Sequence, residues 1–109
     1  MPDLPDIEHD GEVLTESETK LEKPKLYKVI LHNDDFTTMD FVVFILVHVF
    51  LRSEIEAFAI MLKVHNEGIG IAGVYPYEVA ETKAHQVVQF ARENEMPLQA
   101  SLRKSQEEG

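Results

Sequence analysis

An apolar run of eleven residues, from Phe41 to Leu51, constrains this chain more than any other feature, because its one polar residue is His48. A helix needs about 20 apolar residues to span a bilayer, so this run is too short for a membrane segment. It predicts instead a helix with an unusually large apolar surface. Since 44% of the 109 residues are apolar, one domain of ordinary composition has enough apolar side chains to form a core.

The charge of the chain excludes one class of partner. Twenty acidic residues outnumber ten basic ones, which gives a formal net charge of −10. Proteins that bind nucleic acid need a basic surface, so we expect no nucleic-acid partner, and the short apolar run gives no reason to expect a membrane partner. Negative charge favours encounters with positive groups, including the charged amino terminus of another protein.

Cysteine is absent from the sequence, which excludes disulfides, thiolate metal sites and thiol chemistry. A protein without disulfides suits a reducing compartment. The first ten residues are acidic and lack the basic, apolar pattern of a signal peptide, so we expect a cytoplasmic protein. No motif calls for a cofactor.

Composition divides the chain into three parts. Residues 1–25 contain three prolines and many acidic residues without a persistent period, which predicts a flexible acidic N-terminal extension. Residues 26–104 are expected to form the folded domain, and residues 105–109 a polar C-terminal end.

The first half of the folded domain predicts a strand followed by two helices. Residues 26–31 are rich in β-branched and large apolar side chains, and the polar cluster 32–35 ends this strand. Thr37 or Thr38 is placed to cap the first helix. The apolar residues at helical spacing that we expect on its buried face are Met39, Val42, Val43, Leu46 and Phe50.

Ser53 and Glu56 form the capping-box pattern of a second helix, which Gly68 is suited to end. Its expected buried face consists of Ile55, Phe58, Ala59 and Leu62, with Met61 beside them.

The second half predicts a strand over residues 69–75, a helix over about 77–93 and a last strand that contains Leu98, Ala100 and Leu102. The buried stripe of that helix is expected to be Ala80, Ala84, Val87, Val88 and Ala91. The order β-α-α-β-α-β predicts an α+β fold, in which three helices pack on one face of a three-stranded antiparallel sheet.

Polar side chains at two element ends are candidates for a binding site. Asn33 and Asp34 follow the first strand, and His65 lies near the end of the second helix, so the fold has the potential to bring them together. Local sequence alone favours simpler roles: a turn and helix cap for the first two residues, and an exposed or capping histidine for the third. Met39 and Met61 are by themselves typical core residues.

Hypotheses of an enzymatic function have less support. Asp34 and Asp35 are adjacent, so their side chains tend to diverge, unlike the facing carboxylates of an acid–base pair. The glycines at 68, 70 and 73 match a phosphate-binding loop only in part. A metal site made of His32, Asp34 and His65 lacks a supporting spacing, so we expect neither catalysis nor a bound metal.

Three segments taken together resemble a known family. They are LYKVILHNDDFTTMDFV, MLKVHNEGIGIAGVYPYEVAETKA and ARENEMPLQASL, in that order along the chain. They resemble the ClpS adaptors of the bacterial N-end rule pathway over about residues 24–104. This resemblance implies an adaptor that passes proteins with a free, bulky hydrophobic N-terminal residue to a ClpA-type AAA+ unfoldase of the Clp protease.

The resemblance also implies roles for individual residues. Asn33, Asp34 and His65 correspond to the family's ligands of the substrate α-ammonium group, whose three N–H donors they would satisfy if His65 is neutral. The family's pocket for a Phe, Tyr, Trp or Leu side chain corresponds to Thr37, Met39, Val42, Met61, Val64 and Leu98. In the family, the methionine that corresponds to Met39 crowds the pocket mouth and rejects β-branched residues.

The family's docking surface for the unfoldase corresponds to Glu78 and Lys83, which the residues alone would place among ordinary solvated helix charges. The N-terminal extension, residues 1–25, corresponds to the segment that enters the unfoldase pore.

The sequence departs from the family in two places. Pro76 stands where many relatives have a threonine, which leaves the helix intact but alters the expected docking contacts. Phe44, His48 and Leu51 point away from the expected buried face of the first helix. We favour an exposed apolar surface there without a partner, and the more specific hypothesis is self-association or binding of a further partner.

An alternative function is an interaction domain of the same fold that recognises internal segments or folded surfaces.

Overall fold

The computed structural model describes residues 24–105. The predicted flexibility of the N-terminal extension therefore falls almost entirely outside the described residues, as does most of the C-terminal end. The helices and strands are β1 (Leu26–His32), α2 (Met39–His48), α3 (Glu54–Glu67), β2 (Ile69–Pro76), α4 (Tyr77–Glu93) and β3 (Gln99–Lys104). This is the predicted order β-α-α-β-α-β.

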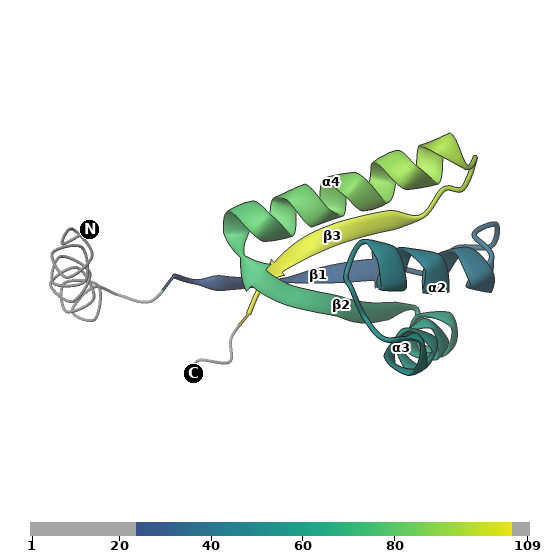
Figure 1. Ribbon diagram of the computed structural model, residues 1–109, viewed down its shortest axis with the longest axis horizontal. Coiled ribbons are helices and arrows are strands. Elements are labelled where there is room, and N and C mark those ends of the chain that lie inside the picture. Colours follow the sequence, from purple (N-terminus) through teal and green to yellow (C-terminus); the bar gives the residue numbers. More distant parts are fainter. Residues whose placement is uncertain (1–23, 106–109) are drawn as a thin grey trace, which may run out of the picture.

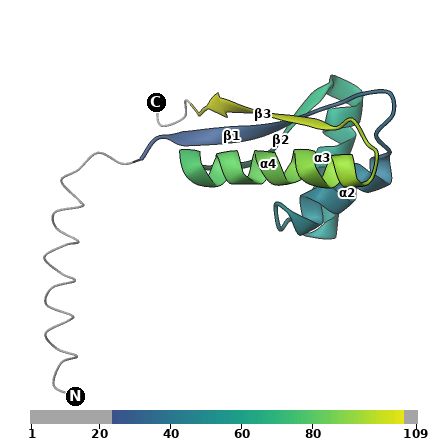
Figure 2. The ribbon, with the colours of Figure 1, turned by 90° about the horizontal axis from the view of Figure 1, so that it is seen from above.

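Strand β1 is the central strand of the sheet and pairs antiparallel with both neighbours, in the order β2-β1-β3. All three helices lie on one face of this sheet (Figures 1 and 2). The predicted fold class is therefore confirmed. The pairing of β1 with β2 shifts between Val29 and Ile30, which leaves Ala72 as an extra residue in β2. Arg52 Nε donates a hydrogen bond of 2.9 Å to the Ala72 carbonyl.

Local sequence signals determine the ends of the helices as expected. Thr38 caps α2, and Ser53 and Glu56 form the complete capping box of α3. Gly68 follows α3 with φ of 94°, a left-handed conformation that glycine adopts without steric cost. Helix α4 begins directly after Pro76, without a side-chain cap. No helix within residues 24–105 has the length and apolar character needed to cross a membrane.

The predicted buried face of α2 is partly wrong. The helix buries Phe41, Val42, Ile45 and Leu46, whereas Met39 is 44% exposed. Phe50 is buried as expected, but it lies beyond the last helical residue. Nearly every position of this helix is apolar, so the spacing of apolar residues does not distinguish the face that packs on the sheet.

The predicted buried face of α3 is wrong. Ile55 is 84% exposed and Phe58 is 53% exposed, and Ala59 and Leu62 are exposed as well. The helix instead buries Ala57, Met61 and Val64, whose spacing is equally helical. This stripe is favoured because it includes a small residue and because Gly70 of β2 allows Val64 to approach the sheet closely.

Phe44, on the outer side of α2, contacts α4 through one aromatic ring. The Phe44 ring lies 4.3 Å from the His48 ring and 6.2 Å from the Phe90 ring, measured between centroids. Leu51 lies outside this group of aromatic rings. It follows the end of α2, is 78% exposed and has φ of 57°.

Candidate functional site

The end of β1 and the last turn of α3 meet at one edge of the sheet. The Asn33 amide donates a hydrogen bond of 2.9 Å to the Gly68 carbonyl, which joins the residue after β1 to the residue after α3. His65 lies three residues before Gly68, in the last turn of the helix. This backbone hydrogen bond therefore fixes the position of Asn33 relative to His65. The local sequence of either segment does not determine that position.

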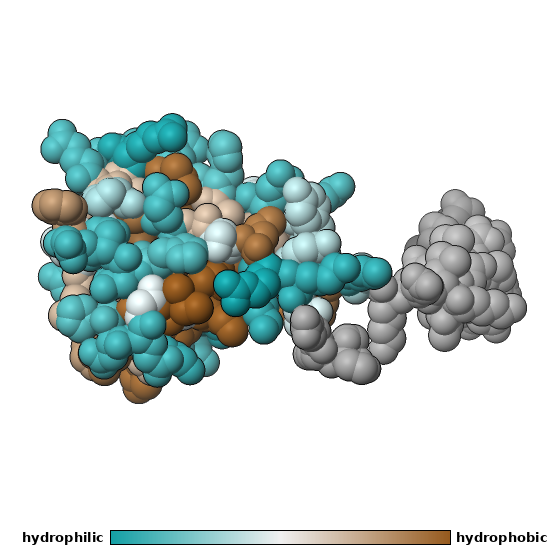
Figure 3. All heavy atoms as spheres, turned by 180° about the vertical axis from the view of Figure 1, so that it is seen from behind, coloured by the Kyte–Doolittle hydropathy of each residue, from teal (hydrophilic) through white to brown (hydrophobic). Residues whose placement is uncertain are grey.

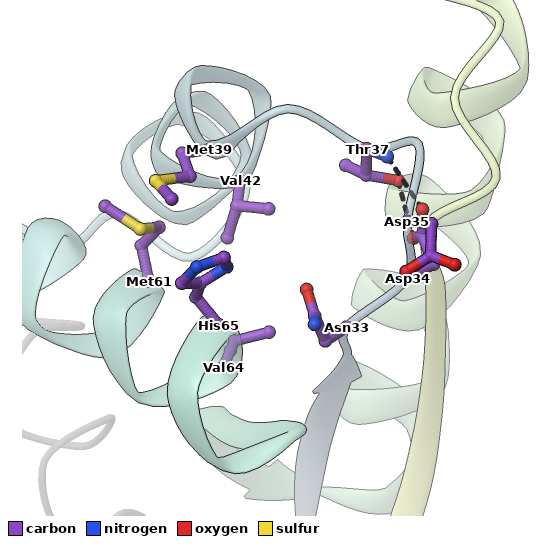
Figure 4. Close-up of a pocket in the computed structure, with 9 residues that line it drawn as sticks. All are labelled: Asn33, Asp34, Asp35, Thr37, Met39, Val42, Met61, Val64 and His65. Atoms are coloured by element: carbon purple, nitrogen blue, oxygen red, sulfur yellow. Dashed lines mark hydrogen bonds between the residues drawn. The ribbon is translucent and has the colours of Figure 1, made fainter.

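A cavity of about 260 Å³ opens at this junction (Figure 4). It is lined by Asn33, Asp34, Asp35, Thr37, Met39, Val42, Met61, Val64 and His65. Eight of the nine residues expected at the site are therefore brought together. The cavity is smaller than the roughly 300–1,000 Å³ of sites for drug-sized ligands, so its size suits a single large side chain.

Two residues are placed differently from the expectation. Leu98 does not line the cavity; it is 1% exposed and belongs to the hydrophobic core. Asp35 lines the cavity although it is not among the expected site residues. The path of the loop between β1 and α2 decides this, and only the polar cluster at residues 32–35 could have indicated it.

Polar and apolar side chains both face the cavity. Asp34 and Thr37 lie on one side and His65 on the other, and the Asn33 side chain projects into the space between them (Figure 4). Both methionines of the wall, Met39 and Met61, lie on the side of His65. The cavity thus combines hydrogen-bonding groups with an apolar wall.

Asp34 is held by three hydrogen bonds from its own loop. Its Oδ1 accepts from the amides of Phe36 and Thr37, at 2.8 and 2.7 Å, and its Oδ2 accepts from the Thr37 hydroxyl at 2.6 Å. Partial burial alone would raise the pKa of this carboxyl, but these hydrogen bonds outweigh it and lower the pKa below its ordinary value. A carboxylate accepts about four hydrogen bonds, so capacity remains for a cationic ligand.

His32, the third member of the metal site considered above, lies outside the cavity. Its Nε2 lies 2.7 Å from the Ser101 hydroxyl of β3, within hydrogen-bonding distance. Among residues 24–105 no cluster of three histidine or acidic side chains is arranged to hold a metal ion.

A second hollow of about 330 Å³ lies along the first turns of α4, and both expected docking residues, Glu78 and Lys83, line it. The Lys83 ammonium donates a hydrogen bond of 2.8 Å to the Val49 carbonyl at the end of α2 and lies 5.5 Å from the centroid of the Tyr75 ring. Lys83 is therefore half-buried and joins α4 to α2, whereas Glu78 is exposed.

Comparisons with known proteins identify relatives of this chain. Residues 22–101 match the model of the family described as ATP-dependent Clp protease adaptor protein ClpS. This chain belongs to the ClpS family. The ClpS adapter of Myxococcus xanthus (strain DK1622) is 57% identical over 97 residues, which cover 87% of this chain and 91% of the relative. The ClpS adapter of Desulfatibacillum aliphaticivorans is 54% identical over 99 residues, which cover 90% and 95%.

A solved structure resembles the fold as well. The structure of Agrobacterium tumefaciens ClpS2 bound to L-phenylalaninamide matches with a TM-score of 0.73 and 36% identity, covering 76% of this chain and all of that chain. As a member of the ClpS family, the protein is an adaptor of the Clp protease and not itself a protease.

Proposed function

We propose that this ClpS-family adaptor binds proteins through a free N-terminal Phe, Tyr, Trp or Leu residue and delivers them to a ClpA-type AAA+ unfoldase in the cytoplasm. The observation that carries this proposal is the composition of one cavity, in which Asn33, Asp34 and His65 lie beside an apolar wall.

The polar part of the cavity suits a terminal ammonium group. An ammonium has three N–H donors, and the Asn33 carbonyl oxygen, the Asp34 carboxylate and a neutral His65 ring nitrogen supply three acceptors. Asp34 is the one charged partner of the three. Its lowered pKa favours the ionised form that pairs with a cation, and a hydrogen bond to a charged group contributes roughly 1.5–3 kcal/mol.

The apolar part of the cavity suits a large side chain. Met39, Val42, Met61 and Val64 form this wall. Burial of a Phe or Leu side chain stabilises a complex by roughly 1.5–3 kcal/mol. L-Phenylalaninamide, the ligand of Agrobacterium tumefaciens ClpS2, combines a free α-amino group with a Phe side chain, which is the chemistry proposed here.

Delivery is assigned to a second surface. We place the unfoldase contact at the hollow lined by Glu78 and Lys83, and we assign the N-terminal extension to the unfoldase pore.

Self-association through Phe44, His48 and Leu51 stays a prediction. Because the Phe44 ring packs on the rings of His48 and Phe90, less of that side is available than the sequence indicated, and sedimentation at high concentration tests self-association.

A peptide titration tests the capture step. A series of peptides that differ only in the first residue should bind in proportion to the fit of that residue, and Asp34→Ala should nearly abolish binding. Asp40→Ala is the matched control, since Asp40 is an acidic residue in the first turn of α2 that does not line the cavity. Binding independent of the first residue would favour the alternative, an interaction domain that recognises internal segments or folded surfaces.

A further inference from the structure

One face of the sheet is covered by no helix of the described part of the chain, as Figures 1 and 2 show. Leu26 and Pro76 lie at the margin of this face, and beyond them the strand register places nine side chains there, which we call the open sheet face. They are Lys28, Ile30 and His32 of β1, Ile69, Ile71 and Val74 of β2, and Gln99, Ser101 and Arg103 of β3. The ammonium-binding cavity lies beyond the end of β1 and shares none of these residues.

The open sheet face is cationic in an acidic protein. None of its nine residues is acidic, although acidic residues outnumber basic ones twofold in the whole chain. Lys28 and Arg103 are direct partners in the pairing of β1 with β3, so two positive charges stand side by side. Like charges at paired positions destabilise a sheet. An anionic group between them would relieve this repulsion.

The same face carries an apolar patch, visible in brown in Figure 3. Ile30 is only 2% exposed, and around it Ile69, Ile71 and Val74 are 39–44% exposed. A ligand that suits the whole face therefore combines acidic side chains with apolar ones.

The N-terminal extension has this composition. Residues 1–22 contain eight acidic residues and one lysine, a balance of −7 out of the net −10 of the chain. Residues 10–16, with the sequence DGEVLTE, place Val13 and Leu14 between Glu12 and Glu16.

We propose that residues 10–16 bind the open sheet face of the same chain. Glu12 and Glu16 pair with Lys28 and Arg103, and Val13 and Leu14 cover the apolar patch around Ile30. This surface does not depend on the proposed peptide capture. Its occupation holds the N-terminal extension against the sheet, so the extension has to be released before it reaches another protein.

The length of the chain permits this contact. Leu26 lies ten residues after Glu16, and ten residues extend at most about 36 Å, whereas seven-residue β1 is about 24 Å long. The segment can therefore reach any part of the face. Because both partners belong to one chain, their effective concentration is of the order of millimolar, so a weak interaction is sufficient.

Paramagnetic relaxation in the full chain tests the proposal. The protein has no cysteine, so Ser17→Cys provides a single attachment point for a nitroxide. We expect broadening of the amide signals of Ile71 and Ser101 on the sheet, and not of Lys63 on α3. Salt at roughly 0.5 M should reduce this broadening at least about threefold, because it shortens the range of charge interactions to a few ångströms.

Three double charge variants distinguish the proposed contact from general attraction. Lys28→Glu with Arg103→Glu should remove the broadening, whereas Lys63→Glu with Arg92→Glu, on α3 and α4, should leave it unchanged. Glu12→Gln with Glu16→Gln should also remove it, without a substitution in the folded domain. The proposal is overturned if the broadening survives both in Lys28→Glu with Arg103→Glu and in Glu12→Gln with Glu16→Gln. It is also overturned if the amide signals of α3 broaden as much as those of the sheet. Broadening that arises only between labelled and unlabelled molecules also overturns the proposal, because the open sheet face would then bind the N-terminal extension of a second copy of the chain.

Discussion

The Thr37 hydroxyl donates a hydrogen bond of 2.6 Å to Oδ2 of Asp34, and the Thr37 amide donates one of 2.7 Å to Oδ1. One residue thus contacts both oxygens of the carboxylate. This orients Asp34 at the cavity and lowers its pKa in opposition to partial burial, together with the Phe36 amide. Thr37, which the family resemblance places in the side-chain pocket, therefore also positions the proposed ammonium ligand.

Replacement of Thr37 by valine removes the hydroxyl and keeps the shape of the side chain. We expect the pKa of Asp34 to rise and the affinity for a peptide with a free N-terminal Phe to fall by roughly tenfold, the equivalent of about one hydrogen bond. Titration of Asp34 by NMR and calorimetry of peptide binding measure the two effects. An unchanged Asp34 titration would contradict this role of Thr37.

The same bonds predict how stability depends on pH. Because the folded protein has a lowered Asp34 pKa, this carboxylate contributes stability above the unfolded value of about 3.9. The contribution is lost as the pH falls through the folded value. The difference in free energy of unfolding between the native protein and Thr37→Val should therefore be present near neutral pH and vanish in acid. A difference that grows in acid would refute this assignment.

Gly70 permits the approach of α3 to the sheet beside the cavity. A Cβ atom at this position would lie 2.7 Å from Val64 Cγ2, so Gly70→Ala has to displace a residue of the cavity wall. We expect a loss of about 1–3 kcal/mol in the free energy of unfolding, and weaker binding of the Phe peptide. Denaturant unfolding measures the first effect.

A double mutant separates this collision from other consequences of adding a methyl group. In the Val64→Ala background the contact atom is absent, so Gly70→Ala should cost less than it does in the native protein. Equal costs in the two backgrounds would show that Val64 is not the obstacle.

Met39 lies in the cavity wall and is 44% exposed, as expected for a residue at the mouth of the cavity. Met39→Ala should increase the affinity for peptides with N-terminal Val or Ile at least about tenfold relative to the Phe peptide, because crowding of β-branched residues is removed. Met96→Ala truncates a methionine outside the cavity and should leave this ratio unchanged. Equal ratios in both variants would remove Met39 as the selective residue.

Glu78 and Lys83 line one hollow but differ in their structural roles. Lys83→Ala loses the hydrogen bond to the Val49 carbonyl and the contact with the Tyr75 ring, and should lower the free energy of unfolding by about 1 kcal/mol. Glu78→Ala should change it by less than about 0.5 kcal/mol, since Glu78 is exposed. Both should weaken binding to the unfoldase without weakening peptide binding. Equal stability of the two variants would contradict the structural role of Lys83.

Sequence predicted the order and the ends of the elements well, because local chemistry determines them. Ser53, Gly68 and Pro76 act within a few residues of their own position. The buried faces of α2 and α3 were less predictable, since both helices carry apolar residues on more than one side and the sheet selects among them. Phe58 is exposed for this reason although its spacing matches a buried stripe.

The site shows the same division between local and tertiary information. The polar cluster after β1 and the histidine at the end of α3 were evident from the sequence, and the resemblance gave them roles. Their meeting depends on the bond between the Asn33 amide and the Gly68 carbonyl, which joins segments 35 residues apart. The placement of Asp35 in the cavity wall and of Leu98 in the core likewise depends on tertiary packing.

The central claim is that the cavity binds a charged chain end beside a large apolar side chain. Calorimetric titration of two peptides, identical except that one has a free N-terminal Phe and the other an acetylated one, tests it most directly. Acetylation removes the charge and two of the three N–H donors, so affinity should fall at least about a hundredfold. Equal affinity for the two peptides would contradict the claim.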